Sequence, residues 1–256
     1  MLPIQQSLGC QSIELLANDH IKLDQLASIV AKYQGDANTV RHLPNLNQPG
    51  LVVLDMDSTS IEIECIDEIA KLAGVGDEVA EITELAMQGQ LDFAQSLRAR
   101  VAKLKGVKLS LLDVIANDLP LMSGMRELAQ QFQSYGWKVA IASGGFTYFA
   151  DNLKQQLSLD EAISNVLEVK DGHLTGELVG KIVDAQVKAD TVLGLAKKYQ
   201  IDLSQTIAIG DGANDLKMME VAALGIAFRA KPLVQQQASV AITQGDLSTV
   251  IALLTR

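Results

Sequence analysis

Short apolar runs alternate with amphipathic stretches along most of the chain, which is typical of a layered α/β fold. The runs Leu51–Leu54 and Thr206–Ile209 have the length and branching of buried parallel strands. A third strand is predicted over Trp137–Ala142, followed by a loop at 143–145 and a helix from Phe146 onward. Because helices follow the strands, the pattern predicts a parallel sheet with helices on both faces.

The C-terminal half continues this alternation. Residues 165–180 predict a hairpin that turns near Asp171-Gly172. A helix is expected over Ala185–Tyr199, another over Ala213–Val221, and a short strand over Gly225–Phe228. The strands among these elements would belong to the same sheet.

An all-helical block interrupts the alternation. From Ile66 to Leu119 the apolar residues recur at helical spacing, with glycines as breaks. The α/β pattern resumes with a helix from Gly124 to Tyr135. We therefore expect an α/β core formed by residues 50–64 and 120–256, with residues 65–119 as an inserted helical unit.

The first 49 residues precede this core. Gln11–Tyr33 has amphipathic spacing that predicts one or two helices. Residues 42–50, with two prolines and several turn-forming residues, predict a linker into the first strand. Residues 1–49 are thus expected to form a small N-terminal element and a linker.

Composition narrows the function. A chain of 256 residues with 48% hydrophobic residues can bury a sizeable core. A formal charge of −10 argues against a nucleic-acid partner, and two distant cysteines cannot build a disulfide framework. No apolar segment approaches the roughly 18 residues of a membrane span, and the N-terminus lacks a secretion-signal pattern. We expect a soluble, cytoplasmic protein with a small-molecule ligand and no membrane partner; a homodimer is left open.

Two acidic clusters carry the candidate chemistry. DMDST at Asp55–Thr59 and GDGAND at Gly210–Asp215 each follow a predicted strand. Open α/β sheets bind ligands beyond the carboxyl ends of their strands, so both clusters can share one edge. Ser58 and Thr59 suit a turn, so we expect the chain to leave strand geometry directly after Asp55. The pattern indicates phosphoryl transfer through an aspartate nucleophile, beside a cation.

Four motifs in order resemble the haloacid dehalogenase superfamily: the pair Asp55 and Asp57, then Ser143, then Lys188, then the pair Asp211 and Asp215. The residues within and around these motifs are similar to those of the phosphoserine phosphatase family. They include Glu64, SLRARV at 96–101, IASGGF at 141–146 and DAQVKAD at 184–190. The resemblance covers roughly residues 50 to 256. It implies a Rossmann-like parallel sheet with helices on both faces and makes residues 65–119 a helical cap of the C1 type.

The resemblance also implies residue roles. Asp55 would be the nucleophile and Asp57 the general acid and base. Mg²⁺ would be held by Asp55, Asp211 and the backbone carbonyl of Asp57, while Asp215 would position the metal's water shell or Lys188.

Other residues would bind the substrate. Ser143, the amides of Gly144 and Gly145, and Lys188 would hold the phosphoryl group, and Asn214 would bind phosphate or orient a neighbour. In the cap region, Glu64 and Arg100 would take the substrate ammonium and carboxylate, and Met87 and Phe93 would shield the site from water.

The implied activity is magnesium-dependent hydrolysis of O-phosphoserine to serine and phosphate, the last step of serine biosynthesis. One alternative is a phosphatase or phosphotransferase of the same superfamily that acts on another small phosphorylated metabolite. A catalytically silent metal-binding module is disfavoured, because it has no need for both Asp55 and a free acid at Asp57.

Overall fold

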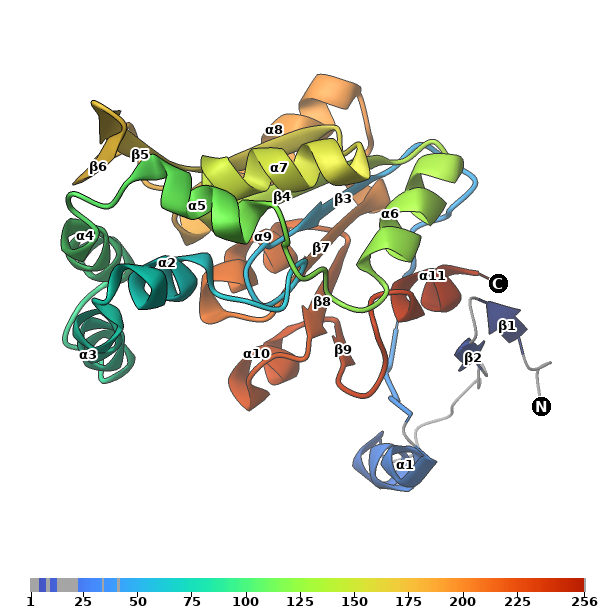
Figure 1. Cartoon of the computed structure of the whole chain (residues 1–256). Coiled ribbons are helices and arrows are strands. Elements are labelled where there is room, and N and C mark those ends of the chain that lie inside the picture. The colour runs from blue at the N-terminus through green and yellow to red at the C-terminus, as the bar shows by residue number, and fades with distance from the viewer. Residues whose placement is uncertain (1–4, 8–9, 13–22, 34, 41, 256) are drawn as a thin grey trace.

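The computed structural model describes residues 5–7, 10–12, 23–33, 35–40 and 42–255. The strands of its main sheet are β3 (Leu51–Leu54), β4 (Lys138–Phe146), β5 (Glu161–Lys170), β6 (His173–Val179), β7 (Thr206–Gly210), β8 (Leu224–Phe228) and β9 (Val240–Ile242). Their order in the sheet is β6-β5-β4-β3-β7-β8-β9 (Figure 1). All neighbours in this sheet are parallel except β5 and β6, which form the predicted hairpin. The predicted α/β fold class is confirmed.

Helices cover both faces of this sheet. They are α6 (Met125–Ser134), α7 (Thr147–Leu157), α8 (Ala185–Tyr199), α9 (Leu216–Val221), α10 (Pro232–Gln237) and α11 (Thr249–Leu254), with the short 3₁₀ turns η2 (Leu203–Gln205) and η3 (Ala213–Asp215). Alternate side chains of β3 point to opposite faces. Val52 packs with the apolar residues of α6, α7 and α11, and Val53 packs with those of α8, α9 and α10. The central strands are therefore buried on both sides, as their apolar runs predict.

Four further helices form what we call the helical layer: three lie at one end of the sheet, and α5 lies against α7 (Figure 1). They are α2 (Cys65–Ala73), α3 (Gly76–Met87), α4 (Phe93–Lys103) and α5 (Leu109–Ala116). Gly74 ends α2 in the left-handed conformation, and a capping box between Asp92 and Gln95 starts α4. The predicted all-helical stretch is confirmed. Among the described helices, none combines the length and hydropathy of a membrane-crossing segment.

Two predictions need correction. The loop expected at 143–145 is wrong, because β4 continues through these residues to Phe146, with an irregular register against β5 between Ala142 and Phe146. The helices expected over Gln11–Tyr33 are only partly right: β1 (Gln5–Ser7) pairs with β2 (Cys10–Ser12), and α1 (Leu23–Val30) leads into the 3₁₀ turn η1 (Ala31–Tyr33). Residues 13–22 lie outside the described part of the chain.

The segment before β3 packs on the sheet. The side-chain amide of Asn38 donates to the carbonyl of Ala241 at 3.0 Å and accepts from its N–H at 2.8 Å, and Ala241 lies in the edge strand β9. Asp36 accepts from the amide of Thr243 at 3.0 Å. These side chains satisfy backbone groups that an edge strand otherwise leaves open.

Trp137 links this segment to the core. Its side chain is 2% exposed, its indole N–H donates to the Leu46 carbonyl at 3.1 Å, and its ring centroid lies 5.0 Å from that of Phe132. Gly50 lies against the same indole: a Cβ at this position would be 2.3 Å from Trp137 Cε2. The start of β3 therefore requires glycine for close approach.

We expect Gly50→Ala to lower the free energy of unfolding by about 1–3 kcal/mol, since the added methyl overpacks the indole. Gly194→Ala is the matched control, because Gly194 lies in α8 with no atom within 4 Å of the added Cβ. That change should raise stability by about 0.5–1 kcal/mol through helix propensity. Urea unfolding followed by circular dichroism measures both, and equal effects of the two changes would contradict the packing argument.

Candidate active site

The first acidic motif begins where β3 ends. The Asp55 N–H still donates to the Ile209 carbonyl of β7 at 2.9 Å. The chain then turns at once: the amides of Ser60 and Ile61 donate to the Met56 carbonyl at 2.8 and 3.0 Å, and Ser58 adopts a positive φ of 57°. The predicted departure from strand geometry directly after Asp55 is confirmed.

The turn brings Asp57 beside the glycines at the end of β4. An ideal Cβ on Gly145 would lie 2.5 Å from Asp57 Oδ2, so only glycine fits there. Asp57 Oδ1 accepts from the Cys65 N–H at 3.0 Å. Desolvation raises the pKa of Asp57 to about 7, the charge of Glu64 adds to the rise, and the Cys65 amide opposes it. A carboxyl group with this pKa can hold or release a proton near neutral pH.

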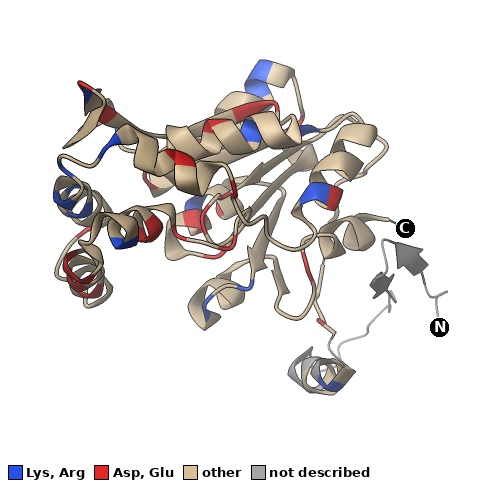
Figure 2. Cartoon of the chain, viewed as in Figure 1, with Lys and Arg blue, Asp and Glu red and all other residues tan. Residues whose placement is uncertain are grey.

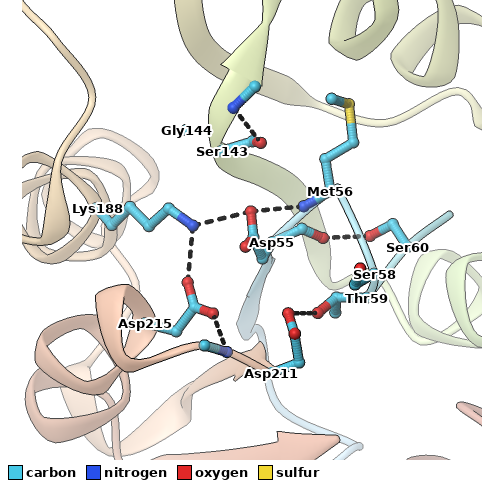
Figure 3. A network of polar contacts seen from close by, with 12 residues as sticks. Asp55, Met56, Ser58, Thr59, Ser60, Ser143, Gly144, Lys188, Asp211 and Asp215 are labelled. Carbon is cyan, nitrogen blue, oxygen red and sulfur yellow. Dashed lines mark hydrogen bonds and ion pairs between the residues drawn. The ribbon is translucent and has the colours of Figure 1, made fainter. Parts of the chain in front are cut away.

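Lys188 lies at the centre of the site. It is fully buried in α8, and its Nζ lies 2.8 Å from Asp55 Oδ1 and 2.7 Å from Asp215 Oδ1 (Figure 3). The side chain of Asp184 caps this helix by accepting from the amides of Gln186 and Val187, both at 2.9 Å. Burial alone would lower the pKa of Lys188, but the carboxylates of Asp215 and Asp55 outweigh it and raise the pKa. Lys188 is therefore an ammonium.

The second acidic motif completes a cluster. Carboxylate oxygens of Asp55, Asp211 and Asp215 lie within 4.8 Å of one another, close enough to share a metal ion. Thr59 Oγ1 donates to Asp211 Oδ1 at 3.1 Å, and Gly212 N donates to Asp215 Oδ2 at 3.0 Å (Figure 3). Burial and the neighbouring charge of Asp55 raise the pKa of Asp211. Oxygen donors crowded in this way favour a hard divalent cation.

The end of β4 lies beside the acidic motifs and is held by side-chain hydrogen bonds. Ser143 is 1% exposed, and its Oγ accepts from the Gly145 amide at 2.9 Å. Asn165 of β5 donates to the Gly144 carbonyl at 2.7 Å and accepts from the Val183 amide at 2.8 Å. The sequence predicts only that Asn165 lies in a hairpin. Nothing in the sequence indicates that its side chain binds the backbone of Gly144 and Val183.

The helical layer reaches the same place. A Cβ on Gly144 would lie 2.7 Å from Phe93 Cζ, so Phe93 of α4 rests on the glycine backbone. Met87, by contrast, is 68% exposed at the end of α3. The structure therefore brings Phe93 to the site and leaves Met87 on the surface.

Glu64 lies at the start of α2, and Arg100 lies in the last turn of α4. Ser58 Oγ donates to Glu64 Oε1 at 2.7 Å, and Glu64 directly precedes α2. The Nε of Arg100 in α4 is buried and has no partner among the described residues. Burial lowers the pKa of Arg100, and the carboxylates of Asp67, Glu64 and Asp57 oppose that change. A buried guanidinium N–H without a partner is suited to a ligand carboxylate.

Three consecutive hydroxyls hold the acidic groups in place. Ser58 binds Glu64, Thr59 binds Asp211, and Ser60 Oγ donates to the Asp55 carbonyl at 2.5 Å. Ser60 is absent from the sequence-based site, although its place after the acidic pair offers a signal. Asn214 lies half-buried in η3, next to Asp215. Figure 2 shows acidic residues in the loops between the sheet and the helical layer.

This arrangement defines a class of enzyme. Residues 49–223 match the haloacid dehalogenase-like hydrolase family, and the chain belongs to that family.

Within that family, the chain groups with the phosphoserine phosphatases. It is 55% identical over 227 residues to phosphoserine phosphatase of Vibrio cholerae. The aligned region covers 89% of this chain and 69% of the relative. It is 60% identical over 211 residues to phosphoserine phosphatase of Haemophilus influenzae. That alignment covers 82% of this chain and 67% of the relative. A solved phospho-aspartyl intermediate analogue of phosphoserine phosphatase superposes with a TM-score of 0.76 at 39% identity, over 81% of this chain and all of that one.

Removing the buried cation should destabilise the fold. Lys188→Met leaves the buried Asp55 and Asp215 carboxylates uncompensated, so we expect the free energy of unfolding to fall by about 3–5 kcal/mol in metal-free buffer at pH 7. Lys198→Met is the control: Lys198 is an exposed residue of the same helix that pairs with Glu161, and its loss should cost far less. Urea unfolding compares the two, and equal losses would rule out the buried ion pair as a major contribution.

Proposed function

We propose that the protein hydrolyses O-phosphoserine to serine and phosphate, with Asp55 as the nucleophile and a magnesium ion at the acidic cluster. The orientation of Asp55 is the observation that carries the proposal. Lys188 Nζ and the Met56 amide both lie against Oδ1, at 2.8 and 2.7 Å. Within the described part of the chain no donor holds Oδ2, so this oxygen is available to attack phosphorus.

In the first step, Oδ2 of Asp55 forms a bond to phosphorus while the bond to the seryl oxygen breaks. Asp57 donates its proton to the departing oxygen. Its position supports this role, since its Oδ2 lies beside Gly145, where the phosphoryl group would be held. The result is serine and a phosphorylated Asp55.

In the second step, water attacks phosphorus and the bond to Asp55 breaks. The Asp57 carboxylate takes the proton of the water, which restores both side chains. A second acid two residues from the nucleophile can serve both steps because it is bound by the Cys65 amide rather than by Lys188.

The oxygen donors fit magnesium. Both oxygens of Asp215 are engaged, one by Lys188 and one by the Gly212 amide. We therefore assign Asp215 a positioning role. The family resemblance supports direct metal contacts from Asp55, Asp211 and the backbone carbonyl of Asp57. Magnesium, when bound, would neutralise charge on the phosphoryl group.

The remaining residues recognise the substrate. Ser143, the amides of Gly144 and Gly145, Lys188 and Asn214 are proposed to hold the phosphoryl group. Glu64 and Arg100 are proposed to bind the ammonium and carboxylate of the seryl part. Residues 65–119 would act as a cap, with Phe93 and Met87 as its apolar lining when substrate is bound.

Asp55→Asn tests the proposed chemistry. It should keep the fold and lower phosphate release from O-phosphoserine by at least about 10³-fold, because the nucleophile is lost. Asp202→Asn, an exposed cap of η2, is the matched control and should keep wild-type activity. A panel of O-phosphoserine, glucose 6-phosphate and a nucleoside monophosphate tests the substrate. Normal turnover by Asp55→Asn would refute the nucleophile, and preference for another monoester would refute the substrate.

Metal removal gives an independent readout. Dialysis against a chelator should abolish turnover, and added Mg²⁺ should restore it. Saturation to about 100 times the Kd should also raise the Tm by about 5 °C, since the ion binds the folded state. Asp211→Asn should weaken both responses. An Asp211→Asn protein with an unchanged magnesium titration would contradict the assigned ligand.

A further inference from the structure

The hairpin β5–β6 joins the sheet to the helical layer. Its turn lies at Asp171 and Gly172, and its tip pairs with the segment between α4 and α5. The Gly106 N–H donates to the Leu174 carbonyl at 2.8 Å, the Leu174 N–H donates to the Val107 carbonyl at 2.8 Å, and the Leu109 N–H donates to the Gly172 carbonyl at 2.9 Å. Residues 106–109 are therefore held by the hairpin as if by a neighbouring strand.

Side-chain packing reinforces this junction. Leu174 is 2% exposed and belongs to the same buried cluster as Leu104 and Leu112 of the helical layer. Gly176 of β6 faces the end of α4: an added Cβ would lie 3.1 Å from Lys105 Cβ and 3.3 Å from Ala102 Cα. The helix backbone thus rests directly on the strand, with no side chain between them.

Helix α4 carries two of the proposed substrate residues. Phe93 is its first residue and Arg100 lies in its last turn, two residues before Ala102. The capping box at Asp92 fixes the other end of the helix. A displacement at Ala102 therefore moves Arg100.

The other end of the hairpin reaches the phosphate pocket. Asn165 of β5 donates to the Gly144 carbonyl at 2.7 Å, and Asn165 pairs with Phe146 at the end of β4. One continuous hairpin therefore contacts both the proposed phosphate loop and the helix that bears the proposed carboxylate ligand.

We propose that hairpin β5–β6 sets the distance between the phosphate pocket and Arg100, so that Gly176 and Leu174 are positioning residues for recognition of the substrate carboxylate. This inference rests on the proposed function, because it assigns Arg100 to that carboxylate. It also predicts that the hairpin tip and the helical layer move as one body.

The test compares Gly176 of β6 with Gly180, which directly follows β6. Gly176 and Gly180 have similar positive φ angles, 87° and 83°, but a Cβ on Gly180 would have no atom within 4 Å. Alanine therefore brings the same backbone strain to both sites and displaces α4 at one. Gly176→Ala should raise the KM for O-phosphoserine about tenfold, since small misplacements of a substrate-binding group have effects of this size or larger. Gly180→Ala should leave the KM near its wild-type value.

A second substrate separates positioning from stability. O-phosphoethanolamine has the phosphate and the ammonium but lacks the carboxylate. The preference for O-phosphoserine over O-phosphoethanolamine, measured as a ratio of kcat/KM values, should fall about tenfold in Gly176→Ala and stay unchanged in Gly180→Ala. A general loss of stability would not change this ratio.

Leu174→Val is a milder second variant that loosens the same junction, and its ratio should fall in the same direction. It decides the question if Gly176→Ala does not fold. An unchanged ratio in the folded variants would overturn the proposal while leaving the proposed function intact. A wild-type protein that releases no phosphate from O-phosphoserine would instead overturn the proposed function.

Discussion

The site depends on the ion pairs between the buried ammonium of Lys188 and the carboxylates of Asp55 and Asp215. A lysine with no solvent exposure is strongly unfavourable unless carboxylates compensate it, and here Asp55 and Asp215 do so at 2.8 and 2.7 Å. The reverse also holds, because three carboxylates cannot stay ionised so close together without positive charge. When ionised, Asp55, Asp211 and Asp215 exceed the single charge of Lys188 by two. A divalent cation bound at this cluster would balance that excess.

Strand register explains why these groups meet. Leu54 pairs with Ile209 on one side and with Ile141 on the other, so the three strands run level toward the same edge. Asp55 then lies beside the start of the Gly210 loop and close to Ser143. Residues that are far apart in sequence become neighbours because parallel strands present their carboxyl ends together. The short turn after Asp55 makes this edge usable for two acids at once.

The sequence was sufficient to predict the strands and helices that carry the acidic motifs and Lys188, because their patterns are local. The apolar, branched run Leu51–Leu54 predicts a strand, and the pattern over Ala185–Tyr199 predicts a helix; the structure has both. Asn165 could not be found in this way, since its role comes from a carbonyl on a neighbouring strand. The extension of β4 through 143–145 was also hidden, because serine and glycines usually indicate a loop while the pairing with β5 decides the outcome. Strand β9 is three residues long and gives too short a pattern to predict.

The two halves of the proposed recognition site differ in how they are held. The phosphate side is built from strand ends and a buried helix, where Asp55, Ser143 and Lys188 have little freedom. The carboxylate side is carried by α4, whose Arg100 retains a buried N–H without a partner in the described part of the chain. A buried N–H without a partner lowers stability until a ligand accepts its hydrogen bond. Substrate binding would therefore stabilise the helical layer more than the sheet. Binding energy from the seryl part would therefore be realised at Arg100, while Phe93 already rests on Gly144.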